Sequence, residues 1–293
     1  MARVFIFILV FGGVFTSCGG DVQKDERRIS VSILPLKYWI DEISGGDFEV
    51  TVVVPPGASP ETYEPIPSQM KEVARSIGYI QTGLLDSEIQ IARGIGSNAP
   101  VLPVLNLSEG LDLLEGVCGH DHSGNSPHHH GTDPHIWLSP VRSLDMVDKI
   151  TDFLITFLPD SASKYRANQE IIKDRINDLN VTIISSLEGL DYRVVLLFHP
   201  FLTYYCDDYR LSQLAIEQDG KEPSVSHLKE IILTIKRTGI YSLFYQEQLH
   251  ENTVAALIAE TGIRAIPLDP LAYNWIENLS KITREIARSE HDE

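Results

Sequence analysis

The sequence predicts an α/β protein in which two lobes, each built on a parallel β-sheet, are joined by one long helix. Short runs of β-branched residues alternate with amphipathic helical patterns in both halves of the chain, as in parallel α/β sheets. An unbroken helical pattern over 162–187 lies between these two series. The 293 residues, 43% of them hydrophobic, are enough for about two domains of roughly 150 residues each.

The first half of the chain contains three pairs of a strand and a helix. The predicted strands are 29–34, 48–54 and 79–82, and the predicted helices are 37–43, 69–77 and 85–95. The stretch 116–132 has neither a strand period nor a helix period and is rich in glycine, serine, aspartate and histidine. We therefore expect a loop there.

Two helices are predicted after this loop, at 140–158 and 162–187, because apolar residues recur at spacings of three and four on either side of Pro159. The strands then resume at 193–198, 211–216, 241–245 and 264–268. The remaining helices are expected at 224–237, with Ser224 as its N-cap, at 251–261 and at 275–288. We assign three structural parts, an N-terminal lobe 29–158, a connecting helix 159–190 and a C-terminal lobe 191–293.

The chain begins with the features of an export signal. An apolar run from Val4 to Thr16 follows Arg3 and is shorter than the roughly 20 residues of a membrane-spanning helix. Small residues and Cys18 come next, and this stretch is similar to the sites where bacterial lipoproteins are cleaved and acylated on cysteine. We expect a signal peptide over 1–17, a lipid on Cys18 that anchors the protein to a bacterial membrane, and a flexible tether over 18–28.

The charge balance argues against nucleic acid as a partner. Asp and Glu number 41 against 24 Lys and Arg, which gives a net charge of −17. Such a chain repels a phosphate backbone unless basic residues cluster, and the sequence contains no such cluster. Two cysteines remain after Cys18, and the sequence leaves a Cys118–Cys206 disulfide and two separate thiols as open alternatives.

Histidines are concentrated in and just after the predicted loop 116–132. They are His120, His122, His128, His129, His130 and His135. Neutral imidazole is a preferred ligand of zinc, copper and nickel, so the first five predict an auxiliary metal-binding segment. The alternative is a solvated loop in which the histidines are incidental.

Other side chains that can bind a metal follow the carboxyl ends of predicted strands, which is where parallel sheets bind their ligands. Glu61 and Glu64 follow a strand of the first half, and His199 and Asp269 each come directly after a strand of the second half. His135 lies between the histidine-rich loop and the first long helix. Each residue alone is more often a cap or a hydrogen-bonded group, but their shared position favours one metal site.

Five motifs in this order resemble the metal-binding lipoproteins that serve bacterial zinc and manganese ABC importers, in particular the periplasmic binding proteins of the zinc-uptake type. The motifs are PGASPETYEP at 56–65, DPHIWLSP at 133–140, FHPF at 198–201, GKEPS at 220–224 and LDPL at 268–271. Segments that are similar to this family extend from about residue 29 to about residue 286.

The resemblance implies two lobes with one metal held in the cleft between them. His135, His199 and Asp269 fall on ligand positions of the family, whereas Glu61 stands where the family usually has histidine. A carboxylate binds zinc at nearly the same length as imidazole, so we expect Glu61 to take its place, with Glu64 as the weaker candidate. Asp133 is expected either to orient the ring of His135 or to cap the following helix.

The identity of the metal depends on two opposing features. Two histidines, one glutamate and one aspartate form an oxygen-rich set, which suits manganese better than three imidazoles do. The histidine-rich loop favours zinc, because manganese gains little from clustered imidazoles and such loops accompany zinc-specific members of the family. We favour Zn(II) as the transported ligand and keep Mn(II) as the alternative.

The leading functional hypothesis is not enzymatic. It is periplasmic, extracytoplasmic binding of Zn(II) by a monomer that delivers the ion to the membrane permease of an ABC importer, with the loop as a collector of metal or a sensor of excess. A zinc-dependent hydrolase with Glu61 as its base is the alternative, although the sequence lacks a zinc-protease helix motif and a Gly-x-Ser-x-Gly elbow. A third class is a surface lipoprotein that binds a partner, as in cell adhesion, with a structural metal.

Overall fold

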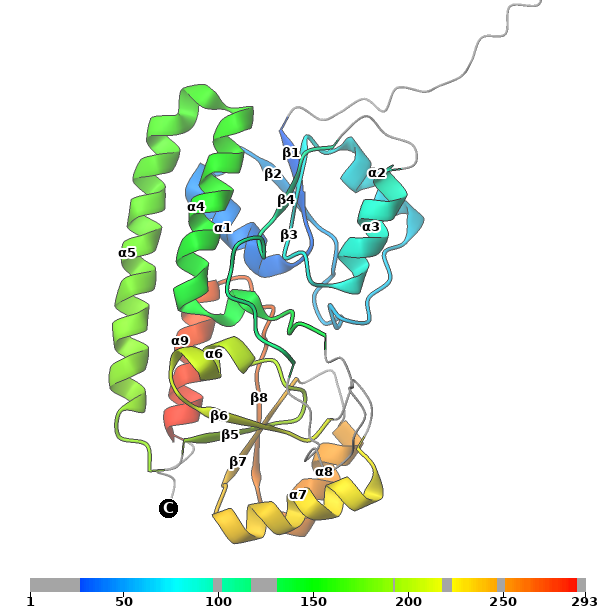
Figure 1. Cartoon of the computed structure of the whole chain (residues 1–293), viewed down its shortest axis with the longest axis vertical. Helices are drawn as coiled ribbons and strands as arrows, with labels where there is room; N and C mark the ends of the chain where they lie inside the picture. The colour runs from blue at the N-terminus through cyan, green and yellow to red at the C-terminus, as the bar shows by residue number, and fades with distance from the viewer. Residues whose placement is uncertain are drawn as a thin grey trace, which may run out of the picture.

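Two four-stranded parallel sheets lie in separate lobes in the computed structural model, which describes residues 27–96, 102–116, 131–191, 193–217, 223–246 and 251–288. The lobes follow one another along the longest axis of the molecule, and helix α5 (Ala162–Leu187) runs beside both of them (Figure 1). The predicted fold class, two parallel α/β lobes joined by a long helix, is confirmed. Among the described residues, none of the helices combines the length and apolar character needed to cross a bilayer.

The N-terminal lobe is built on a sheet with the strand order β2–β1–β3–β4. Its strands are β1 (Arg28–Val31), β2 (Glu49–Val52), β3 (Gly78–Gln81) and β4 (Val104–Asn106). Its helices are α1 (Leu34–Ser44), α2 (Pro67–Arg75), α3 (Asp86–Gly96) and α4 (Pro140–Phe157). Helices α1 and α4 lie on one side of the sheet and α2 and α3 on the other (Figure 1). Because both faces are covered, Ile29 and Val31 on one face of the central strand β1 and Ser30 on the other are all fully buried.

The C-terminal lobe repeats this plan with the strand order β6–β5–β7–β8. Its strands are β5 (Val194–Leu197), β6 (Ser212–Ala215), β7 (Ser242–Tyr245) and β8 (Arg264–Pro267). Its helices are α6 (Thr203–Asp208), α7 (Val225–Thr238), α8 (Glu251–Thr261) and α9 (Trp275–Arg288). The predicted N-cap is confirmed, since the Ser224 side chain accepts the His227 backbone N–H at the start of α7.

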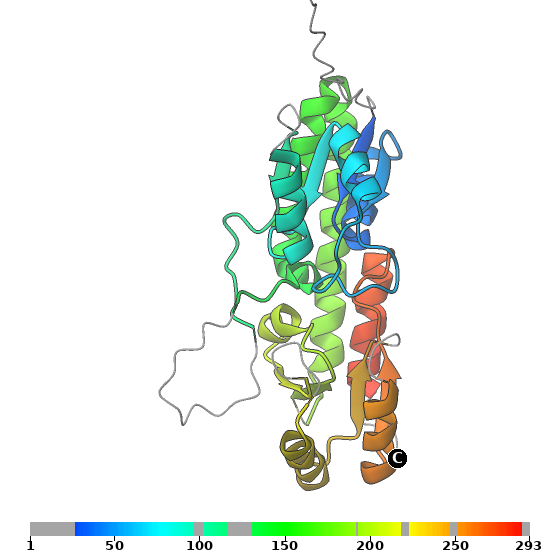
Figure 2. The same ribbon diagram turned by 90° about the vertical axis from the view of Figure 1, so that its right-hand side faces the viewer.

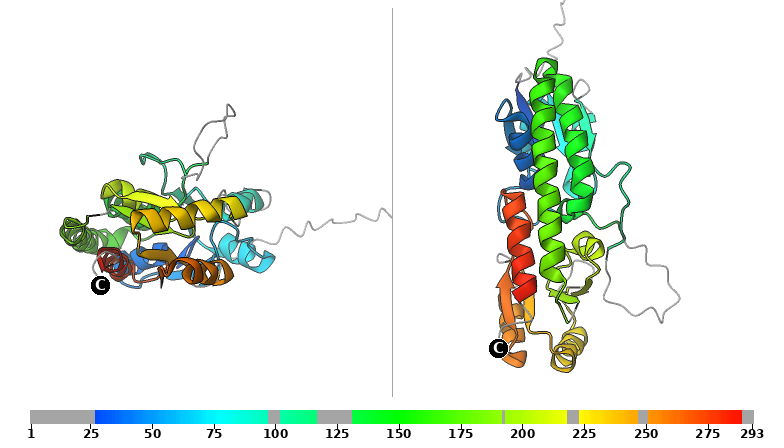
Figure 3. Two further views of the ribbon diagram at one scale, coloured as in Figure 1. Left: turned by 90° about the horizontal axis from the view of Figure 1, so that it is seen from below. Right: turned by 90° about the vertical axis from the view of Figure 1, so that its left-hand side faces the viewer.

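Helix α5 holds the two lobes along one side of the molecule. Its 26 residues rise about 39 Å at about 1.5 Å per residue. The helix packs against α1 and α4 of the first lobe and against α9 of the second (Figures 2 and 3). Its buried residues recur at spacings of three and four, and include Ile172, Ile176, Leu179, Ile183 and Leu187. One continuous hydrophobic cluster therefore includes residues of both lobes, from Ile29 to Ile286.

Candidate metal centre

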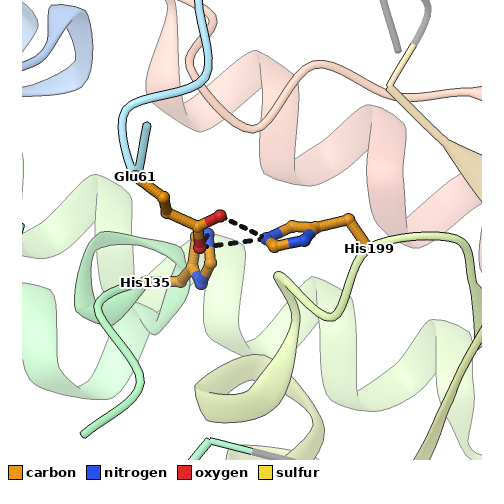
Figure 4. A group of neighbouring side chains, drawn as sticks. All are labelled: Glu61, His135 and His199. Atoms are coloured by element: carbon orange, nitrogen blue, oxygen red, sulfur yellow. Dashed lines mark hydrogen bonds and ion pairs between the residues drawn. The ribbon is translucent and has the colours of Figure 1, made fainter. Parts of the chain in front are cut away.

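Three side chains from distant parts of the sequence point toward one another between the lobes (Figure 4). They are Glu61, His135 and His199, and one ligand atom from each lies within 4.8 Å of the other two. Glu61 comes from the segment between β2 and α2, His135 precedes the short 3-10 helix η1 (Ile136–Leu138), and His199 follows β5. The structure thus brings together three of the four residues expected as metal ligands, namely Glu61, His135 and His199 but not Asp269.

The Glu61 carboxylate faces both imidazole rings. Its Oε1 lies 3.3 Å from His135 Nε2, and both of its oxygens lie 3.0 Å from His199 Nε2. A tetrahedral zinc ion with bonds of about 2.1 Å would separate its ligand atoms by roughly 3.4 Å. The two distances from Glu61 to the imidazoles are close to this value, and all three ligand atoms lie within 4.8 Å of one another, so the three groups fit a zinc ion after side-chain movements of about an ångström. The two rings are largely buried and Glu61 is 28% exposed, which places the open side of the site at the carboxylate.

A buried carboxylate fixes the ring of His135. Asp133 Oδ1 lies 3.0 Å from His135 Nδ1 and accepts the backbone N–H of His135 at 2.8 Å. The other oxygen of Asp133 accepts a hydrogen bond from Thr203 of helix α6 at 2.7 Å. Ser139 caps helix α4 by accepting the Arg142 backbone N–H. Of the two interpretations of Asp133, the structure therefore supports the one in which it orients the imidazole.

The ring of His199 is held by a residue that the sequence analysis did not single out. Glu217 Oε2 lies 2.7 Å from His199 Nδ1, on the edge of the ring away from Glu61. His199 follows β5 at the point where the strand order of the sheet reverses, the usual ligand position in such sheets. Glu217 follows β6 in the same way. The rule that selected the other candidates, a metal-competent side chain just after a strand, would have found it.

The surroundings favour the charged forms of the central groups. Burial by itself raises the pKa of Glu61, but the hydrogen bond from His199 and the charges of both rings hold this pKa below its ordinary value. Burial lowers the pKa of His199, but hydrogen bonds and charges from Glu217 and Glu61 outweigh it and raise this pKa to about 10. Burial also raises the pKa of Asp133, and the neighbouring His135 lowers it further than burial raises it. The two carboxylates therefore favour the protonated ring of His199, and a cation that bound Nε2 would displace the proton shared with Glu61.

Asp269 and Glu64 lie outside the group of three. Asp269 is exposed, and its Oδ1 accepts the Leu271 backbone N–H at 2.8 Å. This hydrogen bond directs the carboxylate toward the backbone of residues 269–271. Asp269 nevertheless lines a small cavity together with residues 57–60, which directly precede Glu61. Glu64 is exposed.

Several other predicted residues lie outside the described part of the chain. They are Cys18, Cys118 and the loop histidines His120, His122, His128, His129 and His130. Cys206 is a buried thiol, and burial raises its pKa to about 12. A thiol with this pKa is protonated near neutral pH and does not offer a thiolate to a metal.

Known proteins share this fold and part of this sequence. A crystal structure of ZnuA matches with a TM-score of 0.82 at 32% identity and covers 90% of this chain and 99% of that one. A zinc-bound ZnuA deletion mutant matches with a TM-score of 0.81 at 31% identity, over 92% and 100% of the two chains. The zinc-binding protein AdcA of Streptococcus pyogenes serotype M6 is 23% identical over 267 residues, 85% of this chain and 51% of AdcA.

The chain thus spans about half the length of the curated AdcA relative. The family model described as zinc-uptake complex component A, periplasmic (ZnuA), matches residues 29–289. This range contains most of the sequence and every described strand of both lobes, apart from Arg28 at the start of β1. With this match and the geometry between its lobes, the chain belongs to the ZnuA family of periplasmic zinc-uptake components.

Proposed function

We propose that this protein binds a divalent transition metal outside the cytoplasm, foremost Zn(II), and delivers it to the membrane permease of an ABC importer. The convergence of Glu61, His135 and His199 between the two lobes is the observation that carries the proposal. Membership of the ZnuA family supports it, as does the zinc bound in a ZnuA relative that is 31% identical.

The geometry of Glu61 favours a ligand over a catalytic base. Both of its oxygens face His199 Nε2, and one of them also faces His135 Nε2. A general base needs a free oxygen directed at the proton that it removes. A carboxylate placed between two imidazoles is instead arranged to share one cation with them. We therefore propose metal carriage without catalysis.

Two imidazoles favour zinc over manganese, because Zn(II) binds nitrogen ligands more strongly in the order of divalent metals. Mn(II) stays the alternative, since carboxylates also suit that ion. We propose Asp269 as the fourth ligand. Its carboxylate would leave the Leu271 N–H and turn into the cavity that it shares with the segment before Glu61.

We also propose that Cys18 carries a lipid anchor and that the loop 116–132 binds additional ions. Deletion of residues 120–130 should lower the number of zinc ions bound per chain and leave the tightest site intact. Equilibrium dialysis followed by metal analysis measures both quantities. Loss of the tight site in this deletion would place the principal ligands in the loop and contradict the site described here.

Metal analysis of the chain from residue 19 onward tests the main proposal. We expect one tightly bound Zn(II) in a competition with a chelator, and weaker binding of Mn(II). His199→Ala and Glu61→Ala should each lose tight zinc, whereas Glu64→Ala, an exposed carboxylate of the same segment, should keep it. Unchanged zinc affinity in Glu61→Ala would remove this residue from the site, and tighter Mn(II) binding would overturn the assignment of zinc.

A further inference from the structure

We infer that Glu217 is a positioning residue of the metal centre, which holds the His199 ring so that Nε2 faces the ion. The inference rests on the proposed metal-binding function and adds a residue to that site. It depends on two observations, the place of Glu217 in the sheet and the hydrogen bond that its side chain makes.

The backbone of Glu217 is fixed beside His199 by the sheet. Strands β5 and β6 pair in parallel with Leu197 opposite Ala215. The pairing continues past the strand ends, since the Ile216 N–H donates to Leu197 O at 2.9 Å and the Glu217 N–H donates to Phe198 O at 2.8 Å. Glu217, two residues beyond the end of β6, is therefore held by a backbone hydrogen bond beside the residue that precedes His199.

The side chain of Glu217 is buried and directed at one nitrogen of the ring. It is 7% exposed, and its Oε2 lies 2.7 Å from His199 Nδ1. A carboxylate at this distance accepts the Nδ1 proton, which leaves Nε2 as the nitrogen that can bind a metal. Nε2 faces Glu61 at 3.0 Å. Glu217 itself stands at the opposite edge of the ring from the ion and so orients the ligand without binding the metal.

The ring of His135 is held in the same way, by a carboxylate at Nδ1, but that carboxylate comes from a different part of the backbone. Asp133 reaches His135 Nδ1 from two residues earlier in the chain, whereas Glu217 reaches His199 Nδ1 from a neighbouring strand. In both cases the carboxylate lies at Nδ1 and Nε2 faces Glu61. The two rings are thus set for Nε2 coordination before an ion arrives, which lowers the ordering cost of binding.

Replacement of Glu217 by Leu tests this role. The variant removes the acceptor at similar size, so we expect zinc affinity to fall about 10- to 100-fold. Glu217→Asp keeps a carboxylate and should bind zinc more tightly than Glu217→Leu. Glu230→Leu is the matched control, because Glu230 is an exposed carboxylate 3.9 Å from the ring of His227 in the same lobe. It should bind zinc as the wild type does.

Nitrogen-15 spectra of the histidine rings give a readout that a merely structural role would not change. In the zinc-loaded wild type, His199 should bind through Nε2 and show a slowly exchanging proton on Nδ1. Glu217→Leu should lose this protected proton, and Glu217→Asp should restore it in part. The wild-type spectrum tests the inference even if Glu217→Leu does not fold, since coordination through Nδ1 would overturn it.

Zinc binding by the wild type and by Glu217→Leu tests the proposed function and the role of Glu217 separately. A wild-type protein that binds no zinc would contradict the function. A wild type that binds zinc tightly, beside a folded Glu217→Leu with equal affinity and an unchanged Nδ1 proton, would contradict only the positioning role of Glu217.

Discussion

As the proposed carboxylate ligand, Glu61 would set the balance between oxygen and nitrogen ligands in the site. Its carboxylate lies beside two imidazoles, and its oxygens lie at hydrogen-bond distance from His199 Nε2. Glu61→His would give a set of three imidazoles, which prefer zinc to manganese more strongly than a mixed set does. We expect this variant to raise the ratio of Zn(II) to Mn(II) affinity. Competition of both ions for one chelator measures that ratio, and a lower ratio in the variant would contradict the role of Glu61 as a ligand.

His199 makes the stability of the metal-free protein dependent on pH. Its pKa of about 10 lies above the ordinary value of about 6.5, so the protonated ring stabilises the fold. This contribution is complete below a pH of about 6.5 and is lost as the pH rises toward about 10. Urea unfolding of the metal-free protein between these pH values should show the loss. His199→Gln should have a flatter profile over the same range, and equal slopes would refute the prediction.

Among the elements, the 3-10 helix η1 is joined to the C-terminal lobe by two hydrogen bonds of indole N–H groups. Trp137 Nε1 donates to Pro270 O at 2.9 Å, and Trp275 Nε1 donates to Trp137 O at 2.6 Å. Both indoles are almost completely buried. His135, two residues before Trp137, is therefore held to the lobe that carries His199, and Glu61 approaches this pair from the segment between β2 and α2.

A buried ion pair between α4 and α6 strengthens the same junction. Arg142 Nη1 lies 2.8 Å from Asp208 Oδ1, and both side chains are largely buried. Arg142→Ala would leave the buried Asp208 carboxylate without its cationic partner, so we expect a loss of about 3 kcal/mol in the free energy of unfolding. Arg166→Ala breaks an exposed pair with Asp152 and should cost less than about 1 kcal/mol. Equal losses of unfolding free energy in urea titrations of the two variants would show that the buried pair stabilises the protein no more than the exposed pair does.

The elements that the sequence predicted are those with a clear period or cap. Helices α5, α8 and α9 have the predicted bounds, because their apolar spacing is regular. Strand β4 and helix α6 were not predicted. Strand β4 has three residues, too few for a period. Helix α6 has six residues and is held by tertiary contacts, such as the hydrogen bond from the Tyr204 hydroxyl to Asp133 O.

The site was predictable where a motif marks the residue. Glu61, His135 and His199 were candidates from their motifs, and the structure places them together. Glu217 lies outside the motifs; the strand-end rule would have made it a candidate, but its contact with His199 depends on the register between β5 and β6, which the sequence does not state. The sequence likewise does not show which way the Asp269 side chain points, because its carboxylate accepts the Leu271 backbone N–H and does not face the other three residues.

At the scale of the whole molecule, we expect the fold not to depend on the metal. The hydrophobic cluster that includes both lobes and α5 is continuous from Ile29 to Ile286. We expect the protein treated with chelator to remain folded, with a cooperative thermal transition by circular dichroism. Zinc at about 100 times its dissociation constant should add about 2.7 kcal/mol of stability. Unfolding on chelation would indicate a structural metal site and not a carrier.

A crystal structure of the zinc-loaded protein, with anomalous scattering measured at the zinc edge, tests the ligand assignment most directly. We predict one strong peak bonded to Nε2 of His135, Nε2 of His199 and a carboxylate oxygen of Glu61, with bonds of about 2.0 to 2.2 Å. A principal zinc peak away from these three atoms, or a His199 bound through Nδ1, would contradict the metal centre described here.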